Sequence, residues 1–171
     1  GATKWKTVVT VVIPAFREQN WLGSALDSLR AQTYPLWRAV VVDDQSDDRT
    51  SSIAVSYSTK DPRISVLRLR RNSGLPAARN AGLTQVDTPY VMFLDADNWY
   101  EPPHVQTMIG VLTESGADAV IGTRTIHAID GSAMYIDTIE SNGENMIDTN
   151  TWALTRKSLP YLHAWVVEPQ N

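Results

Sequence analysis

The sequence predicts an α/β fold in which a Rossmann-like, mostly parallel sheet is flanked by helices in a single domain. Short apolar runs alternate with amphipathic segments over the first 125 residues, which is typical of a doubly wound sheet. The apolar runs are nearly continuous, as in parallel strands that are buried on both faces. A chain of 171 residues is long enough for one such domain with its own core.

The elements can be justified in chain order. Residues 7–14 are rich in β-branched side chains, which predicts a buried strand ending at Pro14. From Leu22 the apolar residues recur at i, i+3, i+4 and i+7, the spacing of one helix face. Pro76 suits the first turn of a later helix that runs to Gln85. The other predicted elements are strands over residues 37–42, 64–69, 90–94 and 119–125, a helix capped by Asp47 and Asp48, and a helix from Pro103 to Glu114.

Beyond Ile126 the alternation ends. Residues 127–150 are rich in Gly, Asn and Asp, so we expect loops or short extended pieces over the sheet edge. The net charge of −4 gives no reason to expect a nucleic-acid partner. The lack of cysteine excludes a disulfide framework and a cysteine nucleophile. No apolar run approaches the roughly 20 residues of a membrane span, and we expect a cytoplasmic protein, either free or peripheral to the membrane.

Polar residues gather where the predicted strands end. The apolar run over residues 91–94 is followed at once by Asp95, Ala96 and Asp97. The three earlier strands run into the segments 14–18, 43–48 and 71–74, each of which contains charged residues or amide side chains. Ligands of open α/β sheets bind outside the carboxyl ends of the strands, so we expect these four segments to form one crevice. Carboxylates there suit a Mg²⁺-like ion, which uses one or two of them together with substrate phosphates.

Some of these side chains also have uses that require no ligand. Asp43 or Asp44 could accept a hydrogen bond from an imide N–H such as that of uracil, or could stabilise a turn and cap a helix. Arg79 could pair with a phosphate or with an acidic neighbour, or it could lie on a solvated helix face. Phe16 could cover a flat base. An Asp-x-Asp pair can also be a turn, so its neighbours decide its meaning.

Four motifs carry a resemblance to a known family. They read VVIPAFRE at residues 11–18, VVDDQSDDRT at 41–50, RNSGLPAARNAG at 71–82 and VMFLDADN at 91–98. In this order and spacing, the chain resembles the family 2 nucleotide-sugar glycosyltransferases, which have the GT-A fold. The resemblance implies one GT-A domain over residues 1–171. Its nucleotide-binding part would be 7–100, and the floor for donor and acceptor would be 101–171, truncated at the C-terminus.

The resemblance also implies a role for each matching residue. The donor would be a UDP-sugar, and the acceptor a hydroxyl of a glycan, a lipid or another molecule. Asp97 would hold Mn²⁺ or Mg²⁺ against the diphosphate, alone or with Asp95, which would also hold the ribose. Family members usually transfer the sugar with inversion. The residues expected to bind the nucleotide are Pro14, Ala15, Phe16, Glu18, Asp43, Asp44, Arg79, Asp95 and Ala96.

The four matching motifs do not identify the catalytic base. In the family it belongs to an acidic motif that follows a segment resembling NTWALTRK at residues 150–157. Glu168 is the only late carboxylate and is the candidate here; the alternative is a base beyond Asn171. The missing part would leave apolar surface exposed, including Trp152, Leu154, Leu162 and Trp165, and this predicts self-association.

Three other functions compete with this one. A haloacid-dehalogenase phosphatase would carry Asp-x-Asp after its first strand, whereas here the pair follows the fourth. A dinucleotide-dependent oxidoreductase would need G-x-G-x-x-G after the first strand, where this chain has Pro14, Ala15 and Phe16. The third is a catalytically incomplete module that binds a nucleotide sugar or a partner and transfers nothing.

Overall fold

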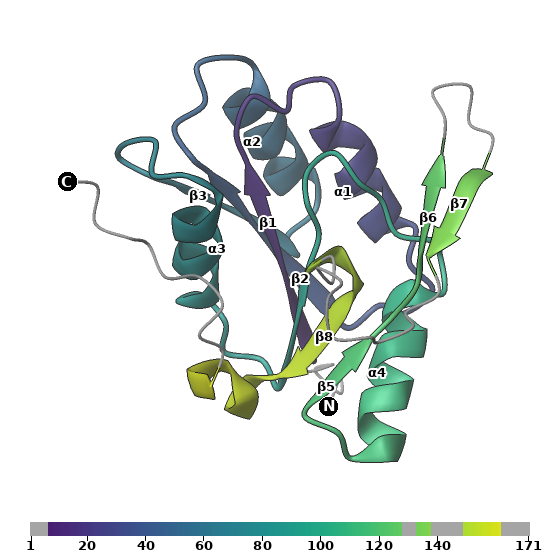
Figure 1. The fold of residues 1–171 in the computed structure, drawn as a ribbon. Helices are drawn as coiled ribbons and strands as arrows, with labels where there is room; N and C mark the ends of the chain where they lie inside the picture. The colour runs from purple at the N-terminus through teal and green to yellow at the C-terminus, as the bar shows by residue number, and fades with distance from the viewer. Residues whose placement is uncertain (1–6, 128–132, 138–148, 162–171) are drawn as a thin grey trace, which may run out of the picture.

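The computed structural model describes residues 7–127, 133–137 and 149–161 (Figure 1). A central six-stranded sheet has the strand order β3-β2-β1-β4-β8-β5. Its strands are β1 (Val9–Ala15), β2 (Trp37–Asp43), β3 (Ile64–Arg68), β4 (Tyr90–Phe93), β5 (Ala119–Ile121) and β8 (Trp152–Thr155). The pairs β1–β2, β1–β4 and β2–β3 are parallel, while β8 runs antiparallel to both β4 and β5. The mostly parallel sheet predicted from the sequence is therefore confirmed.

Helices cover both faces of this sheet. They are α1 (Leu22–Arg30), α2 (Thr50–Lys60), α3 (Leu75–Leu83) and α4 (His104–Ser115), with short 3₁₀ turns η1 (Thr149–Thr151) and η2 (Arg156–Tyr161). Side chains of a strand alternate between its faces, and β1 shows the result. Val11 and Ile13 belong to the core shared with α1, α2 and α4. Val12 belongs to a second core beneath α3. All seven residues of β1 are buried, as its continuous apolar sequence predicts.

Helix α3 lies close to the sheet because of one glycine. A Cβ added to Gly82 would stand 2.3 Å from Cγ1 of Val12 and 3.1 Å from Cγ2 of Val42. No larger residue fits between this helix and β1 without a shift of the backbone. The position of α3 on the sheet also sets the position of its N-terminus. The residue just before the helix is Gly74, whose φ of +84° is readily adopted only by a residue without a Cβ.

The prediction of one strand over residues 119–125 is wrong. The chain leaves the central sheet after β5, at Gly122, whose N–H donates to the carbonyl of Thr151 at 2.8 Å. It then forms β6 (Arg124–His127), which pairs with β7 (Ala133–Asp137) in a separate antiparallel sheet. Strand β8 was not predicted, because a segment of four residues, followed by a charged one, is too short to show the hydrophobic periodicity of a strand.

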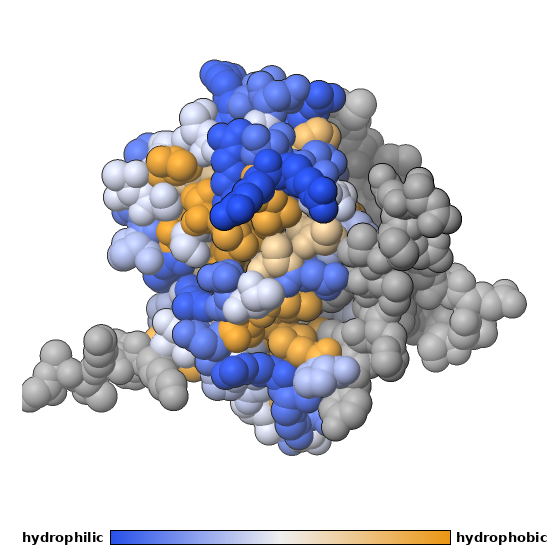
Figure 2. Space-filling view, turned by 90° about the vertical axis from the view of Figure 1, so that its left-hand side faces the viewer, coloured by the Kyte–Doolittle hydropathy of each residue, from blue (hydrophilic) through white to orange (hydrophobic). Residues whose placement is uncertain are grey.

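The expectation of an exposed Leu154 is also wrong. Its side chain in β8 is 2% exposed, because β8 lies between β4 and β5, and Trp152 is partly buried in the core under α3. Leu162 and Trp165 lie outside the described residues. Apolar side chains are exposed on the side of the molecule where α3 and β3 lie (Figure 2). Helix α3 packs on β1 and β2, and Leu67 on β3 is only partly buried. Self-association remains a prediction.

Among the described residues, no helix combines the length and apolarity that crossing a membrane requires.

Candidate nucleotide-sugar site

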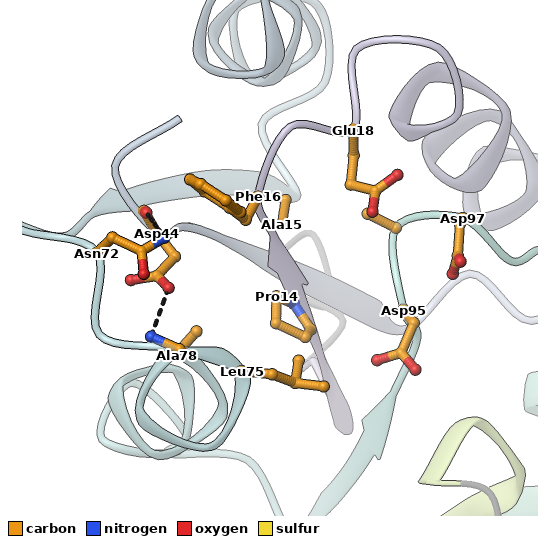
Figure 3. A pocket seen from close by; sticks show the side chains of 12 residues that line it. Pro14, Ala15, Phe16, Glu18, Asp44, Asn72, Leu75, Ala78, Asp95 and Asp97 are labelled. Atoms are coloured by element: carbon orange, nitrogen blue, oxygen red, sulfur yellow. Dashed lines mark hydrogen bonds between the residues drawn. The ribbon is translucent and has the colours of Figure 1, made fainter. Parts of the chain in front are cut away.

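A pocket of about 320 Å³ opens at the carboxyl ends of β1, β2 and β4, beside the N-terminus of α3 (Figure 3). Its volume lies at the lower end of the range for small-molecule sites. The four segments predicted to converge at this edge therefore meet there. The pocket is lined by Pro14, Ala15, Phe16, Glu18, Asp44, Asn72, Gly74, Leu75, Ala78, Asp95, Ala96 and Asp97.

Asp44 and Asp43 occupy different environments, although both were candidates to contact a base. Asp44 lines the pocket, and its two carboxylate oxygens accept the backbone N–H groups of Ser73 and Gly74 at 2.8 Å each. Asp43 is fully buried behind the pocket, where Oδ1 accepts the N–H of Ser46 at 2.9 Å and Oδ2 lies 3.3 Å from Nε of Arg68. Asp43 thus supports the loop that carries Asp44 and does not reach the pocket.

Asp95 is held from two sides. Nη2 of Arg79, on α3, donates to Oδ1 at 2.8 Å, and both side chains are largely buried. Nδ2 of Asn150 donates to Oδ2 at 3.0 Å, while Oδ1 of Asn150 accepts the backbone N–H of Asp95. Arg79 pairs with an acidic neighbour, which is one of the partners expected for it, and it does not line the pocket. Its role toward a nucleotide stays a prediction. These contacts fix the orientation of Asp95.

Asp97 and Glu18 lie together at the other end of the pocket, where Asp97 is exposed (Figure 3). Burial raises the pKa of Glu18, and the negative charges of Asp97, Asp48 and Asp95 raise it further. The contribution of these three carboxylates shows that negative charges lie near one another at this end of the pocket. A bound cation would relieve that crowding, so the charge at this end of the pocket suits a divalent ion.

The loop that carries Phe16 is tied to the loop after β2. Nε and Nη2 of Arg17 donate to the two carboxylate oxygens of Asp47, each at 2.8 Å, and this bonding lowers the pKa of Asp47. The guanidinium lies 5.1 Å from the ring centroid of Phe16. The N–H of Glu18 donates to Oγ1 of Thr50 at 2.8 Å. Arg17 has a φ of +58°, which is rare for a residue with a side chain. The two loops together hold Phe16 at the pocket.

Some site residues escaped prediction from the sequence. Asn72 and Gly74 belong to a segment predicted to converge here, but neither was singled out. Leu75 and Ala78 look like ordinary helix residues, and only the placement of α3 brings them to the pocket. Asn150 is 55 residues from Asp95, and no local pattern signals this contact. Glu168 lies outside the described residues.

No group of three or more His, Asp, Glu or Cys side chains in the described part of the chain forms a complete metal site. Asp97 still fits a metal that takes its other ligands from a bound diphosphate and water. Asp95 fits less well, because Arg79 and Asn150 already occupy its oxygens.

Comparison with known proteins agrees with this geometry. The model of the family described as "Glycosyl transferase family 2" matches residues 10–163. Glycosyltransferase GlyA of Streptococcus pneumoniae is 39% identical over 114 residues, which are 67% of this chain and 16% of GlyA. The putative teichuronic acid biosynthesis glycosyltransferase TuaG of Bacillus subtilis is 30% identical over 132 residues, which are 77% of this chain and 52% of TuaG. The chain thus spans about half of TuaG and a smaller part of GlyA.

Solved structures share the fold at lower identity. The structure of residues 1–349 of S. aureus TarS in complex with UDP-GlcNAc has a TM-score of 0.75 and 20% identity, covering 92% of this chain and 48% of that one. The mannosyltransferase PcManGT of Pyrobaculum calidifontis, in complex with GDP-Man and Mn²⁺, has a TM-score of 0.73 and 19% identity, covering 96% and 49%. With the fold, the pocket and the family match together, this chain belongs to glycosyl transferase family 2 and has a GT-A-type α/β fold.

Proposed function

We propose that this domain binds a UDP-sugar with a divalent metal ion and transfers the sugar, with inversion, to an acceptor hydroxyl. The observation that carries the proposal is the placement of Asp44 and Asp97 at opposite ends of one pocket (Figure 3). One carboxylate suits the base of the nucleotide and the other suits a metal beside the diphosphate. The UDP-GlcNAc complex of TarS and the Mn²⁺ complex of the mannosyltransferase support this reading.

Asp44 suits the recognition of uracil. The N–H groups of Ser73 and Gly74 donate to the two side-chain oxygens of Asp44 and hold the carboxylate in one orientation. An ionised carboxylate only accepts hydrogen bonds, so it can pair with the imide N–H of uracil and cannot pair with the ring nitrogen of cytosine at that position. Phe16 would cover the base, and Pro14 and Ala15 would form the wall below it.

The middle of the pocket suits the ribose. Asp95 is oriented by Arg79 and Asn150, and a carboxylate held in this way can accept the hydroxyls of a sugar. Ala96, which is 2% exposed, leaves room beside it. Glu18 stands at the rim next to Asp97 and is close enough to the diphosphate end to affect its charge.

Asp97 would hold the metal, and Mn²⁺ and Mg²⁺ both remain candidates. The ion would neutralise the negative charge that builds on the departing UDP. The acceptor hydroxyl must lose its proton as it attacks, and Glu168 is the candidate for the carboxylate that takes it.

Calorimetric titration of UDP with Mn²⁺, with Mg²⁺ and without metal tests the donor site. We expect metal-dependent binding that Asp97→Ala abolishes and that Asp27→Ala, at an exposed carboxylate on α1, leaves unchanged. Failure of UDP to bind under every condition would overturn the proposal.

A second assay separates transfer from binding. If UDP binds, hydrolysis or transfer of the sugar should be measurable, and Glu168→Gln should abolish transfer while UDP binding persists. Metal-dependent binding with no turnover on any donor would support the catalytically incomplete module instead.

A further inference from the structure

Arg68 ends β3 and lies beside the loop that carries Asp44. In the parallel pair β2–β3, Arg68 is the register partner of Asp43. Paired residues of neighbouring strands point to the same face of a sheet, and here Nε of Arg68 lies 3.3 Å from Oδ2 of Asp43. Neither side chain lines the pocket, so any effect of this pair on a bound nucleotide must pass through the loop.

The guanidinium of Arg68 contacts two further acceptors of the same loop. Nε donates to Oε1 of Gln45 at 3.3 Å, and Nη2 donates to the carbonyl of Ser46 at 3.0 Å. The planar guanidinium of an arginine can serve several acceptors at once, whereas the ammonium of a lysine is a single point charge. One side chain thus contacts three of the four residues from Asp43 to Ser46.

The carboxylate of Asp43 depends on this partner. The residue is fully buried, and its Oδ1 accepts the N–H of Ser46 at 2.9 Å. Within the described ranges of the chain, Oδ2 accepts no hydrogen bond, and its one ion pair is with Arg68. Removing one partner of such a pair leaves a buried charge without compensation. Without Arg68, the loop would have to move to bring this oxygen to water.

The loop also has a backbone conformation that needs support. Gln45 has a φ of +61°, which is rare for a residue with a side chain. Conformations of this kind persist only where the surrounding contacts hold them. The two hydrogen bonds from Arg68 reach the side chain of Gln45 itself and the carbonyl of the next residue. Arg68 therefore stabilises the turn directly as well as through Asp43.

This loop positions both side chains that are proposed to contact the base. Asp44 belongs to it. Oγ of Ser46 accepts the N–H of Arg17 at 3.1 Å, and Arg17 directly follows Phe16. Asp44 and Phe16 lie at the same end of the pocket (Figure 3). A shift of the loop would therefore displace both of them.

We propose that Arg68 is a positioning residue for recognition of the base. It fixes the loop from Asp43 to Ser46, and with it Asp44, so that the pocket selects uridine nucleotides; this assignment rests on the proposed binding of a UDP-sugar. The diphosphate would lie at the other end of the pocket, beside Asp97. Loss of Arg68 should therefore weaken discrimination between bases more than it weakens binding of the diphosphate.

Titration of the intact chain with UDP and with CDP, both in the presence of Mn²⁺, tests this role, because the two ligands differ only in the base. We expect the unchanged protein to prefer UDP. Arg68→Gln should weaken UDP binding about three- to tenfold, the range expected when one or two side chains must be ordered on binding, and should change CDP binding less than about twofold. A general loss of folded protein would lower both affinities and leave their ratio unchanged.

Arg70→Gln is the matched control. Arg70 is exposed, and among the described residues it makes no ion pair and no side-chain hydrogen bond. The variant removes the same charge two residues along the chain and should leave both affinities within about twofold. Arg68→Lys keeps the charge but not the planar geometry, so its UDP affinity should lie between those of the unchanged protein and Arg68→Gln.

Combining Arg68→Gln with Asp43→Asn tests the route of the effect. Asparagine keeps an oxygen for the N–H of Ser46 but removes the charge that Arg68 pairs with. Because Arg68 acts on the same loop as Asp43, the double variant should bind UDP within about twofold of the weaker single variant. Losses that add in the double variant would show two independent effects and would contradict the proposal.

Amide hydrogen exchange gives a readout that needs no nucleotide. The N–H groups of Ser46 and Arg17 have their acceptors in this loop. Arg68→Gln should speed their exchange at least about threefold, and Arg70→Gln should not, because exchange follows local opening.

Three outcomes of the titrations would overturn the role of Arg68: unchanged UDP affinity in Arg68→Gln, equal losses for UDP and CDP, or equal effects of Arg68→Gln and Arg70→Gln. Failure of the unchanged protein to bind UDP, or to prefer it over CDP, would instead count against the proposed function. The exchange rates would then still decide whether Arg68 fixes the loop.

Discussion

Gly82 couples the stability of the fold to the shape of the site, and Gly82→Ala tests this coupling. The added methyl group would lie 2.3 Å from Cγ1 of Val12, where ordinary contacts begin at 3.4 Å. Helix α3 would have to move by about 1 Å, because Val12 lies in a fully buried strand of a close-packed core. The same helix carries Arg79, which holds Asp95 at 2.8 Å, so the displacement would reach the pocket.

The expected cost follows from two opposing effects. Overpacking a close-packed core typically costs about 1–3 kcal/mol, and a contact this short lies at the upper end. Alanine is favoured over glycine in a helix by about 1 kcal/mol. The net loss in the free energy of unfolding should therefore be about 2 kcal/mol. Urea denaturation followed by tryptophan fluorescence measures it as a lower midpoint at an unchanged slope.

Gly110→Ala in α4 is the matched control. Its added Cβ meets nothing within 4 Å, so the helix propensity acts alone and should stabilise the protein by about 0.5–1 kcal/mol. UDP affinity should fall in Gly82→Ala and stay unchanged in Gly110→Ala. A Gly82→Ala protein as stable as the original would refute the close approach of α3 to β1.

Two further predictions concern pH and the loops at the pocket. Burial lowers the pKa of His104 from 6.5 to about 4, so the unfolded chain binds more protons between these values. The free energy of unfolding is therefore unaffected by His104 above pH 6.5. It decreases as the pH falls from 6.5 to about 4, by up to about 3 kcal/mol in total. His104→Gln should flatten the plot of unfolding free energy against pH in this window, and an unchanged slope would contradict the assignment. Asp47→Ala removes the ion pair of the exposed Arg17. We expect little change in stability but about threefold weaker UDP binding, because the loop that carries Phe16 is then less well fixed. Asp118→Ala, which breaks an exposed ion pair elsewhere, is the control. Equal UDP affinities in the two variants would show that the pair does not position Phe16.

The candidate site was largely predictable because its residues follow strands. Continuous apolar runs mark buried parallel strands, and the topology of such sheets brings the residues after them to one edge. Asp44, Asp95 and Asp97 could therefore be placed together before any coordinates. The sequence could not show which of Asp43 and Asp44 lines the pocket. Adjacent residues at a strand end point in different directions, and which of them meets the pocket depends on the path of the loop.

Contacts between distant segments were beyond local reasoning. Asn150 reaches Asp95 across 55 residues, and Arg79 could equally have lain on a solvated helix face until α3 was placed on the sheet. The short strand β8 has too few residues to show a period. Its position between β4 and β5 depends on backbone pairing with both neighbours, and this pairing also buries Leu154.

By itself, the sequence determined the helices and strands of the first 115 residues, the edge at which the site forms and most of the residue types in it. Hydrophobic periodicity and turn residues act over a few neighbours, so a linear reading recovers them. The tertiary structure decided the insertion of β8, the separate β6–β7 sheet, the burial of Asp43 and the anchoring of Asp95. These depend on which distant surfaces pack and pair, and no local pattern encodes that choice.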